Sequence, residues 1–415
     1  MRATGRPPNI VFLLVDCLRS RSVFRGSTAR RLKAIGTLVA EGASFPETVA
    51  TATVTTPSMG SLFTGTLPHT HGIRGLNEGK LDPELATMAE ILRDHGYHTH
   101  AEATGPVVPQ FGFDRGFASF HHRDADDENV YTSYWDRLEL RLKSLMAESP
   151  WFLYLHLFEL HEFAVVPRAF NRRRFGNTSY ERALVALDNT RLSRLLEIIG
   201  PETLVILTAD HGELVPRFHL PVRIGERVGR QLGIPSIRRY FEDRHGHGNH
   251  VTEDLVLVPL ILRGPGVPRG LRVDASVRHV DVFPTVLELA GVDDPRASQG
   301  VGESLAPFFL GRGRARPGYS EALDSRLGYP RPIRIAVRQN GWKYAETLDG
   351  SARWLWRLPD ERRDVSAMHP SVADRMRALL GRFRPADALA RDEAALTVSE
   401  QAEVETHLRG LGYID

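Results

Sequence analysis

The stretch from Ala50 to Gly72, ATATVTTPSMGSLFTGTLPHTHG, places hydroxyl side chains directly before a predicted helix. Thr55 comes just before Pro57, and the apolar residues that follow predict a short helix over Ser58–Gly65. The first backbone N–H groups of a helix are unpaired and lie at the positive end of its dipole, so an anion binds well there. Ordinary helix capping is the simpler explanation of this stretch when it is taken alone. Residues elsewhere in the chain decide between the two.

Candidate metal ligands follow three apolar runs of the sequence. Asp16 comes directly after NIVFLLV, Asp210 and His211 come just after TLVILT, and His161 comes just past WFLYLHLF. The carboxyl ends of parallel strands meet at one edge of a sheet, where active sites of such folds lie. Carboxylate, imidazole and hydroxyl groups together suit a hard or borderline divalent cation. Each residue alone has a structural explanation, as a turn residue, a helix cap or a buried histidine. Their joint placement, with Thr55 before its helix, predicts a metal site.

The bulk composition is that of a globular protein. The chain has 415 residues, of which 42% are hydrophobic and 25% charged, and its net charge is +2. This balance gives no global field for nucleic acid, and no run approaches membrane-spanning length. The apolar run near the start ends at Asp16 without a small-residue cleavage site, so it predicts a buried strand and a cytoplasmic protein. The single cysteine, Cys17, excludes an internal disulfide and a cysteine-based metal cluster.

Strand and helix patterns alternate over the first three quarters of the chain. This alternation predicts an α/β fold with a large, mostly parallel sheet between helices. The predicted strands are Asn9–Val15, Tyr97–Thr104, Trp151–Phe158, Thr203–Thr208 and Leu255–Leu262. The predicted helices are Thr28–Glu41, Pro83–His95, Tyr134–Met146, Ser179–Ile199 and Val282–Leu289, with residues 111–129 irregular.

The pattern changes after about residue 315. Short strands over Ile333–Gln339, Trp342–Thr347 and Ala352–Leu358, with helices over Pro370–Arg382 and Val398–Leu411, predict a different architecture. We therefore expect a catalytic domain over residues 1–315, a small antiparallel subdomain over 316–385 and a helical tail over 386–415. Within the catalytic domain, residues 214–244 are rich in arginine and hold three prolines. We expect this segment to be an insertion or lid that contacts an anionic substrate, with a solvated helix as the alternative.

Several motifs resemble the sulfatase family of the alkaline phosphatase superfamily. They are NIVFLLVD, TTPSMGSLFTG with LPHTHG, LTADHGE, HGHGNHVTEDLVLVPLILRGPG, HVDVFPTVLELAG, IAVRQNGWKYAE and LRGLGYID, in order along nearly the whole chain. The resemblance implies an alkaline phosphatase-like fold and a metal-dependent hydrolase of phosphate or sulfate esters. It implies one divalent cation (Ca, Mg, Mn or Zn), with a second as an option. The implied ligands are Asp16, Asp210, His211 and Thr55, which is also the implied nucleophile. The resemblance leaves three roles open for His161 and His247: binding the ester oxyanion, protonating a leaving group or holding a second metal.

The departures from the family pattern bear on the chemistry. Sulfatases usually carry a Cys or Ser that becomes formylglycine, with an Arg four residues later, whereas these positions are Thr55 and Met59 here. The second Asp of the usual pair is Cys17, and the usual Lys and His pair after GYHTHAEATG is missing. Threonine cannot become formylglycine, and relatives with Thr at this position are typically phosphodiesterases, phosphomonoesterases or phosphotransferases.

This resemblance favours P–O ester cleavage, by hydrolysis or transfer, through a covalent intermediate on Thr55. A divalent cation and a helix N-terminus would both favour the ionised hydroxyl. A sulfuric ester hydrolase without formylglycine and a non-catalytic metal-binding relative are the alternatives. The expected partner is a small-molecule, glycan-linked or lipid-linked anionic ester. Nucleic acid is not expected, because the arginine-rich segment lacks an aromatic stacking pattern, and no prediction of oligomeric state follows.

Overall fold

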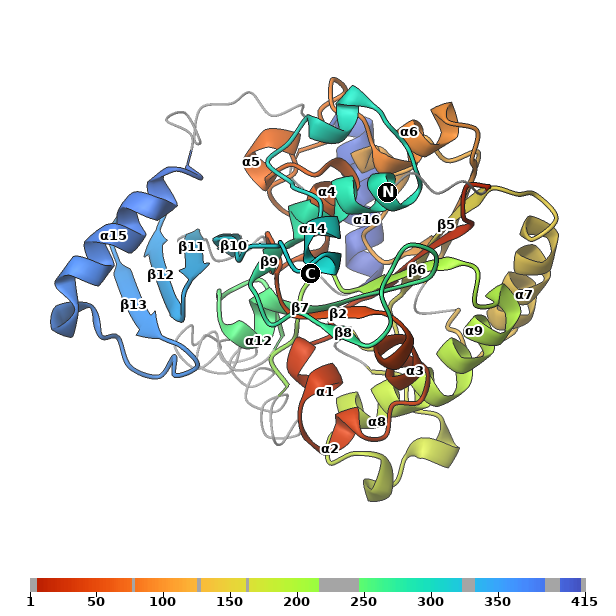
Figure 1. Ribbon diagram of the computed structural model, residues 1–415, viewed down its shortest axis with the longest axis horizontal. Helices are drawn as coiled ribbons and strands as arrows, with labels where there is room; N and C mark the ends of the chain where they lie inside the picture. The colour runs from red at the N-terminus through yellow and green to blue at the C-terminus, as the bar shows by residue number, and fades with distance from the viewer. Residues whose placement is uncertain are drawn as a thin grey trace.

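The computed structural model describes residues 6–76, 79–124, 128–161, 164–215, 246–322, 333–384 and 396–411. Its large sheet has nine strands, mostly parallel, with β7 antiparallel to both of its neighbours (Figure 1). In spatial order the strands are β4 (Ser119–Arg123), β3 (His98–Thr104), β5 (Trp151–Leu157), β1 (Ile10–Val15), β6 (Leu204–Thr208), β7 (Leu257–Arg263), β2 (Ala43–Val49) and β8 (Leu271–Arg272), and β9 (Val277–Arg278) pairs with β2.

The central strands are apolar throughout because helices cover both faces of the sheet. Along β1, Ile10, Phe12 and Leu14 join one core cluster, while the alternate residues join the other. The first face is covered by α4 (Thr55–Thr64), α6 (Met88–Asp94), α13 (Val282–Leu289) and α16 (Val398–Gly410). The second face is covered by α3 (Ala34–Glu41), α7 (Tyr134–Leu145), α8 (Ser179–Leu187) and α9 (Ser193–Ile199).

A second, antiparallel sheet follows in the C-terminal part of the chain and lies to one side of the large sheet (Figure 1). Its strands are β10 (Gly318–Ala322), β11 (Arg334–Gln339), β12 (Trp342–Thr347) and β13 (Arg353–Arg357), with α15 (Pro370–Gly381) packed on β11 and β12. Strand β10 also meets the stretch before α4, since Thr53 N–H donates to the Glu321 carbonyl. The predicted fold class, a large mostly parallel sheet with a small antiparallel subdomain, is confirmed.

Shorter helices complete the described chain: α1 (Ser20–Phe24), α2 (Gly26–Ala29), α5 (Pro68–His71), α12 (Glu253–Val256) and α14 (Ala306–Phe309). The predicted C-terminal tail ends in α16, whose Val404 and Leu408 are buried in the core of the large sheet. This helix therefore packs on the large unit, not on the second sheet.

Some predicted elements differ from the structure for local reasons. The helix expected over Thr28–Glu41 is divided, because the Asp188 carboxylate accepts hydrogen bonds from Ala34 N–H and Ile35 N–H and so starts a new helix at α3. The helix expected over Pro83–His95 begins later, after a capping box formed by Thr87 and Glu90.

Five strands were not predicted from the sequence, namely β2, β4 and the short strands β8, β9 and β10. Strand β2, ASFPETV, contains a proline and a register shift between Phe45 and Thr48, so it shows no clean alternation. Strand β4 lies inside residues 111–129, which were expected to be irregular. The predicted long helix over Ser179–Ile199 is present with a π-helical turn at Asp188–Leu192. Of the predicted lid, only Leu214 and Val215 are described; the rest lies outside the described residues.

Candidate active site

Helix α4 begins at Thr55, not after Pro57 as the sequence predicted, and Val54 in extended conformation precedes it. The Thr55 side chain is fully buried at the helix N-terminus. Its Oγ1 lies 3.4 Å from Asp16 Oδ2 and 3.4 Å from His211 Nε2. The hydroxyl therefore faces an acid and an imidazole in addition to the first N–H groups of the helix.

Strand register places the two aspartates of the site, Asp16 and Asp210, next to each other. Strand β1 pairs with β6 so that Leu14 faces Thr208, which places Asp16 beside Asp210 just beyond the strand ends. Strand β1 also pairs with β5 so that Leu14 faces His156, and His156 Nε2 lies 3.3 Å from Asp16 Oδ2. The parallel pairing thus brings three residues far apart in sequence to one point at the carboxyl edge of the sheet.

The side chain of His211 is oriented by its own neighbours. Its Nδ1 lies 2.8 Å from the Gly212 carbonyl, so Nδ1–H donates there and Nε2 faces the carboxylates. His211 Nε2 lies 3.1 Å from Asp210 Oδ2. One ligand atom from each of Asp16, Asp210 and His211 lies within 4.8 Å of the others. Asp16 Oδ1 is buried without a hydrogen bond, so this donor set fits a divalent cation.

The pKa values of the two aspartates are shifted in opposite directions, because their neighbours differ. Burial and the neighbouring Asp210 raise the pKa of Asp16 well above its usual range. Burial also acts to raise the pKa of Asp210, but His211 and His156 outweigh it and lower that pKa. Burial acts to lower the pKa of His211, and Asp210 with Asp16 raises it overall. The pair Asp210–His211 therefore carries charge, while the charge of Asp16 is costly without a cation.

A second group of polar side chains lies beside this one. Cys17 has a left-handed backbone with φ 61°, and its N–H donates to Asp210 Oδ1 at 3.3 Å. Its Sγ lies 3.5 Å from Glu213 Oε2 and 3.8 Å from His247 Nδ1. Burial, reinforced by the nearby carboxylates, raises the pKa of the Cys17 thiol well above its usual value. The residue that departs from the sulfatase pattern therefore lies inside the site.

His161 joins the same group from the end of β5. Its ring stacks on Phe158 with centroids 4.3 Å apart and lies 5.1 Å from the His247 ring. Ligand atoms of His161, Asp16 and Cys17 also lie within 4.8 Å of one another. Burial, with help from His247, lowers the pKa of His161 well below its usual value. His161 is therefore neutral at pH 7.

The structure brings all the predicted site residues to one place: Asp16, Thr55, His161, Asp210, His211 and His247. Sequence reasoning missed the contacts of three others, namely Cys17, Glu213 and His156. Glu213 could have been found, because it belongs to the same TADHGE segment as the predicted ligands. His156 had no such signal, since a histidine within an apolar strand has many structural explanations.

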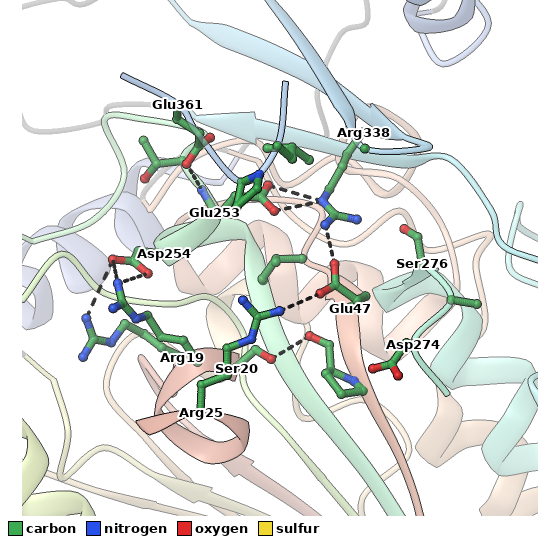
Figure 2. Close-up of a pocket in the computed structure, with 18 of the residues that line it drawn as sticks. Arg19, Ser20, Arg25, Glu47, Glu253, Asp254, Asp274, Ser276, Arg338 and Glu361 are labelled. Carbon is green, nitrogen blue, oxygen red and sulfur yellow. Dashed lines mark hydrogen bonds and ion pairs between the residues drawn. The ribbon is translucent and has the colours of Figure 1, made fainter. Parts of the chain in front are cut away.

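A large hollow in the described part of the molecule is distinct from this group. It has a volume of about 960 Å³ and lies between α1, β2, α12 and the second sheet, and its described lining includes none of the predicted site residues (Figure 2). Its charges pair with one another: Arg338 bonds Glu253 and Glu47, and Arg19 and Arg21 contact Asp254. Because these charges are already neutralised, the hollow is a junction between two sheets and a poor candidate for the chemistry.

Comparisons with known proteins agree with this geometry. The Sulfatase family model matches residues 8–292, well over half of the chain. The ulvan-active sulfatase of Formosa agariphila is 23% identical over 413 residues, covering 85% of this chain and 75% of that protein. Two crystal structures share the fold at lower identity. Ps i-CgsB in complex with k-i-k-neocarrahexaose has a TM-score of 0.69 at 19% identity and 97% coverage of each chain. The phosphonate monoester hydrolase SpPMH from Silicibacter pomeroyi has a TM-score of 0.67 at 18% identity, covering 93% of this chain and 96% of that one.

The chain belongs to the sulfatase family. It is accordingly a hydrolase that acts on ester bonds, as the sequence predicted. The helices that the structure describes are all too short or too polar to span a lipid bilayer.

Proposed function

We propose that this protein is a metal-dependent hydrolase or transferase of anionic esters, with Thr55 as its nucleophile and a preference for P–O bonds. One observation carries the proposal: Thr55 Oγ1 lies 3.4 Å from both Asp16 Oδ2 and His211 Nε2 at the N-terminus of α4. A nucleophilic hydroxyl needs a group that accepts its proton and a setting that favours negative charge. The Asp16 carboxylate and the helix N-terminus supply these two requirements.

Asp16, Thr55, Asp210 and His211 would hold the cation, which is Ca, Mg, Mn or Zn from the donor types. When bound, a divalent cation stabilises negative charge on the ester oxygens. Thr55 Oγ1–H points at Asp16 Oδ2, and the Gly212 carbonyl keeps His211 Nε2 directed toward the same point. These bonds fix the attacking atom before the substrate binds.

His161 and His247 would act on the leaving-group side. The ring of His247 lies 4.3 Å from that of His211 and 5.1 Å from that of His161, so the two histidines continue the site from His211. A neutral imidazole donates one hydrogen bond without carrying a full charge. His161 therefore suits binding of an ester oxygen better than complete protonation of a leaving group at pH 7.

The proposed preference for P–O esters rests on the side chain at position 55. A threonine cannot become formylglycine, so the usual sulfatase nucleophile cannot form here, whereas a hydroxyl can attack phosphorus directly. The shared fold with a phosphonate monoester hydrolase is compatible with this preference. Sulfate ester cleavage is the second candidate, favoured by the sulfatase relative. The substrate would be an anionic ester on a small molecule, a glycan or a lipid.

A substrate panel combined with three variants tests this function. Nitrophenyl phosphate, a phosphodiester, a phosphonate monoester and a sulfate ester are assayed with added divalent cations. Thr55→Ala should lower kcat by about 10³-fold or more on the best substrate, and Thr55→Ser should retain much of the rate. Thr56→Ala is the matched control, because the Thr56 hydroxyl bonds the Gly75 carbonyl at 2.7 Å and should affect the rate only mildly.

A brief reaction quenched in acid should leave phosphate on the peptide that contains Thr55. Near wild-type turnover by Thr55→Ala would rule out this nucleophile and favour direct attack by water. A rate on the sulfate ester above that on every phosphorus ester would overturn the P–O preference. The same three variants, assayed on the sulfate ester, would then test whether Thr55 is the nucleophile.

A further inference from the structure

The site contains a second triangle of potential ligands besides the one near Thr55. Cys17 Sγ, Glu213 Oε2 and His247 Nδ1 are separated by 3.5 Å (sulfur to oxygen), 3.8 Å (sulfur to nitrogen) and 3.3 Å (nitrogen to oxygen). The three residues are at most 5% exposed. They come from three separate segments: the turn after β1, the turn after β6 and the loop before α12.

These separations match the edges of a tetrahedral metal site. Zinc binds thiolate at about 2.3 Å and imidazole or carboxylate at about 2.0–2.2 Å, which gives ligand-to-ligand edges of about 3.3–3.6 Å. Two of the three observed edges fall in or at the end of this range, and the third is 0.2 Å longer. Little movement would be needed for all three atoms to contact one ion.

An independent observation points to a cation here. Glu213 Oε1 is buried and has no hydrogen bond. Within the described residues, no ion pair joins Asp16, Asp210 or Glu213 to a lysine or arginine. Burying three carboxylates without a lysine or arginine partner is expensive. One divalent cation at Asp16 and Asp210 balances those two groups and leaves Glu213 without compensation.

The two triangles do not compete for the same histidine. His211 Nδ1 is bonded to the Gly212 carbonyl, so His211 is committed through Nε2 to the side of Asp16 and Asp210. His247 instead has Nδ1 within 3.3 Å of Glu213 Oε2. The cluster therefore divides into an oxygen-rich triangle and a sulfur-containing triangle.

We propose that Cys17, Glu213 and His247 form a second metal site that takes zinc or a similar borderline transition metal. A thiolate ligand selects against Ca²⁺ and Mg²⁺, which prefer oxygen donors. Binding exchanges the thiol proton for the metal, so one Cys–SH and one M²⁺ give one Cys–S–M⁺ and one released H⁺. His161, within reach of Cys17, is placed to be a fourth ligand or to leave that position to a substrate oxygen. The site adds to the proposed function but does not need Thr55 to be the nucleophile.

Cobalt(II) titration of the metal-stripped full-length protein tests this site directly. Because Cys17 is the only cysteine of the chain, any sulfur-to-cobalt charge-transfer band reports this residue. We expect two Co²⁺ per chain, with an intense near-ultraviolet charge-transfer band and visible bands of tetrahedral type. Two reciprocal variants then separate the sites. Cys17→Ser should bind one Co²⁺ and lose the charge-transfer band, whereas Asp210→Asn should lose the other ion and keep the band.

His247→Asn provides a second way to remove the site if Cys17→Ser does not fold, and it should also leave one Co²⁺ per chain. Absence of the charge-transfer band at saturating Co²⁺ would overturn the proposal and leave Cys17 as a hydrogen-bonded thiol. One ion per chain that carries the band would place Cys17 in a single shared site and would also overturn it. Thr55→Ala should keep the charge-transfer band, because Thr55 is not among the three ligands of the second site, so a failure of the nucleophile assignment would be seen separately from a failure of the second site.

Discussion

Two regions of the molecule bury several charges close together, and they do so in different ways. At the junction of the two sheets, Arg338 contacts the acids Glu47 and Glu253 (Figure 2). Lys343 contacts Glu253 and Glu361 in the same region. At the carboxyl edge of the large sheet, Asp16, Asp210 and Glu213 instead contact histidines and a cysteine. The acids of the junction have lysine or arginine partners, whereas the acids of the edge have none among the described residues.

The pKa directions of Glu253 at the junction and Asp16 at the edge show the same contrast. Burial acts to raise the pKa of Glu253, but Lys343 and Arg338 outweigh it and the pKa falls. Burial raises the pKa of Asp16, and its carboxylate neighbour raises it further. A buried acid with a basic partner stabilises a fold, while a buried acid beside another acid needs a ligand. The comparison therefore separates structural charges from functional ones.

The largest effect is expected at the edge of the large sheet. Asp210→Asn keeps an oxygen that can accept the Cys17 N–H but removes the charge that would hold the cation. Loss of several kcal/mol of charge stabilisation should lower kcat/KM by about 10³-fold. Metal content after dialysis, measured by mass spectrometry, should fall in the same variant, while the far-ultraviolet circular dichroism spectrum should not change. Full metal content in both Asp210→Ala and Asp16→Ala would contradict this assignment.

The reverse pattern is expected at the junction. Lys343 is buried, and its ammonium group contacts Glu253, Glu361 and the Val251 carbonyl. Lys343→Met removes the cation and leaves two acids together, so the free energy of unfolding should fall by roughly 3 kcal/mol. Denaturant unfolding would measure this loss. Metal content and kcat of the folded enzyme should stay near wild type.

Arg362→Ala is a suitable control for the junction, because its ion pair with Asp360 is exposed and should contribute little. If Lys343→Met were as stable as Arg362→Ala, the paired charges of the junction would not be structural. If it lost metal, the two regions would be coupled and the comparison would fail.

Much of the fold could be predicted because the central strands are apolar on both faces. IVFLLV, WFLYLHL and LVILT each form a strand of the large sheet, and the short strands after residue 315 form the second one. The strand β2 could not be predicted because Pro46 and a register shift hide its alternation. The break before α3 depends on Asp188, more than 150 residues away, so no local pattern contains it.

The candidate site was predictable where a ligand follows an apolar strand directly. Asp16, Asp210 and His211 have that signal, and strand register brings them together. The contacts of Cys17 with Glu213 and His247 depend on the crossing of three loops, so spacing along the chain does not contain them. The start of α4 at Thr55 was also missed, since Pro57 suits the first turn of a helix at more than one position.

The smallest expected effect is a change in the pH dependence of stability at His71. This buried histidine packs under the helix that begins at Thr55, and it sharpens the comparison because it is neither charged nor a site residue. Its Nδ1 accepts the Ile73 N–H at 3.2 Å, and its Nε2 lies 3.1 Å from the Pro57 carbonyl, so the neutral ring satisfies both contacts. Burial lowers the pKa of His71 from 6.5 to about 3. A base with a lowered pKa in the folded state contributes stability that is fully present above pH 6.5. That stability is lost as the pH falls toward 3, because the unfolded chain binds the proton first.

Between pH 8 and pH 5, His71 should therefore lower the free energy of unfolding by about 2 kcal/mol, at about 1.4 kcal/mol per pH unit below 6.5. His71→Gln cannot titrate, so its difference in stability from wild type should shrink by that amount over the same range, as measured by urea unfolding at each pH. The ring also packs directly against Gly60, where a Cβ would lie 2.5 Å from it, so it is closely enclosed on that side. A constant difference between the two proteins from pH 8 to pH 5 would mean that His71 takes up its proton without leaving the fold. The helix that begins at Thr55 would then pack against a charged histidine. A buried charge without an ion-pair partner among the described residues would in that case occur outside the site as well, and the comparison between the two regions would fail.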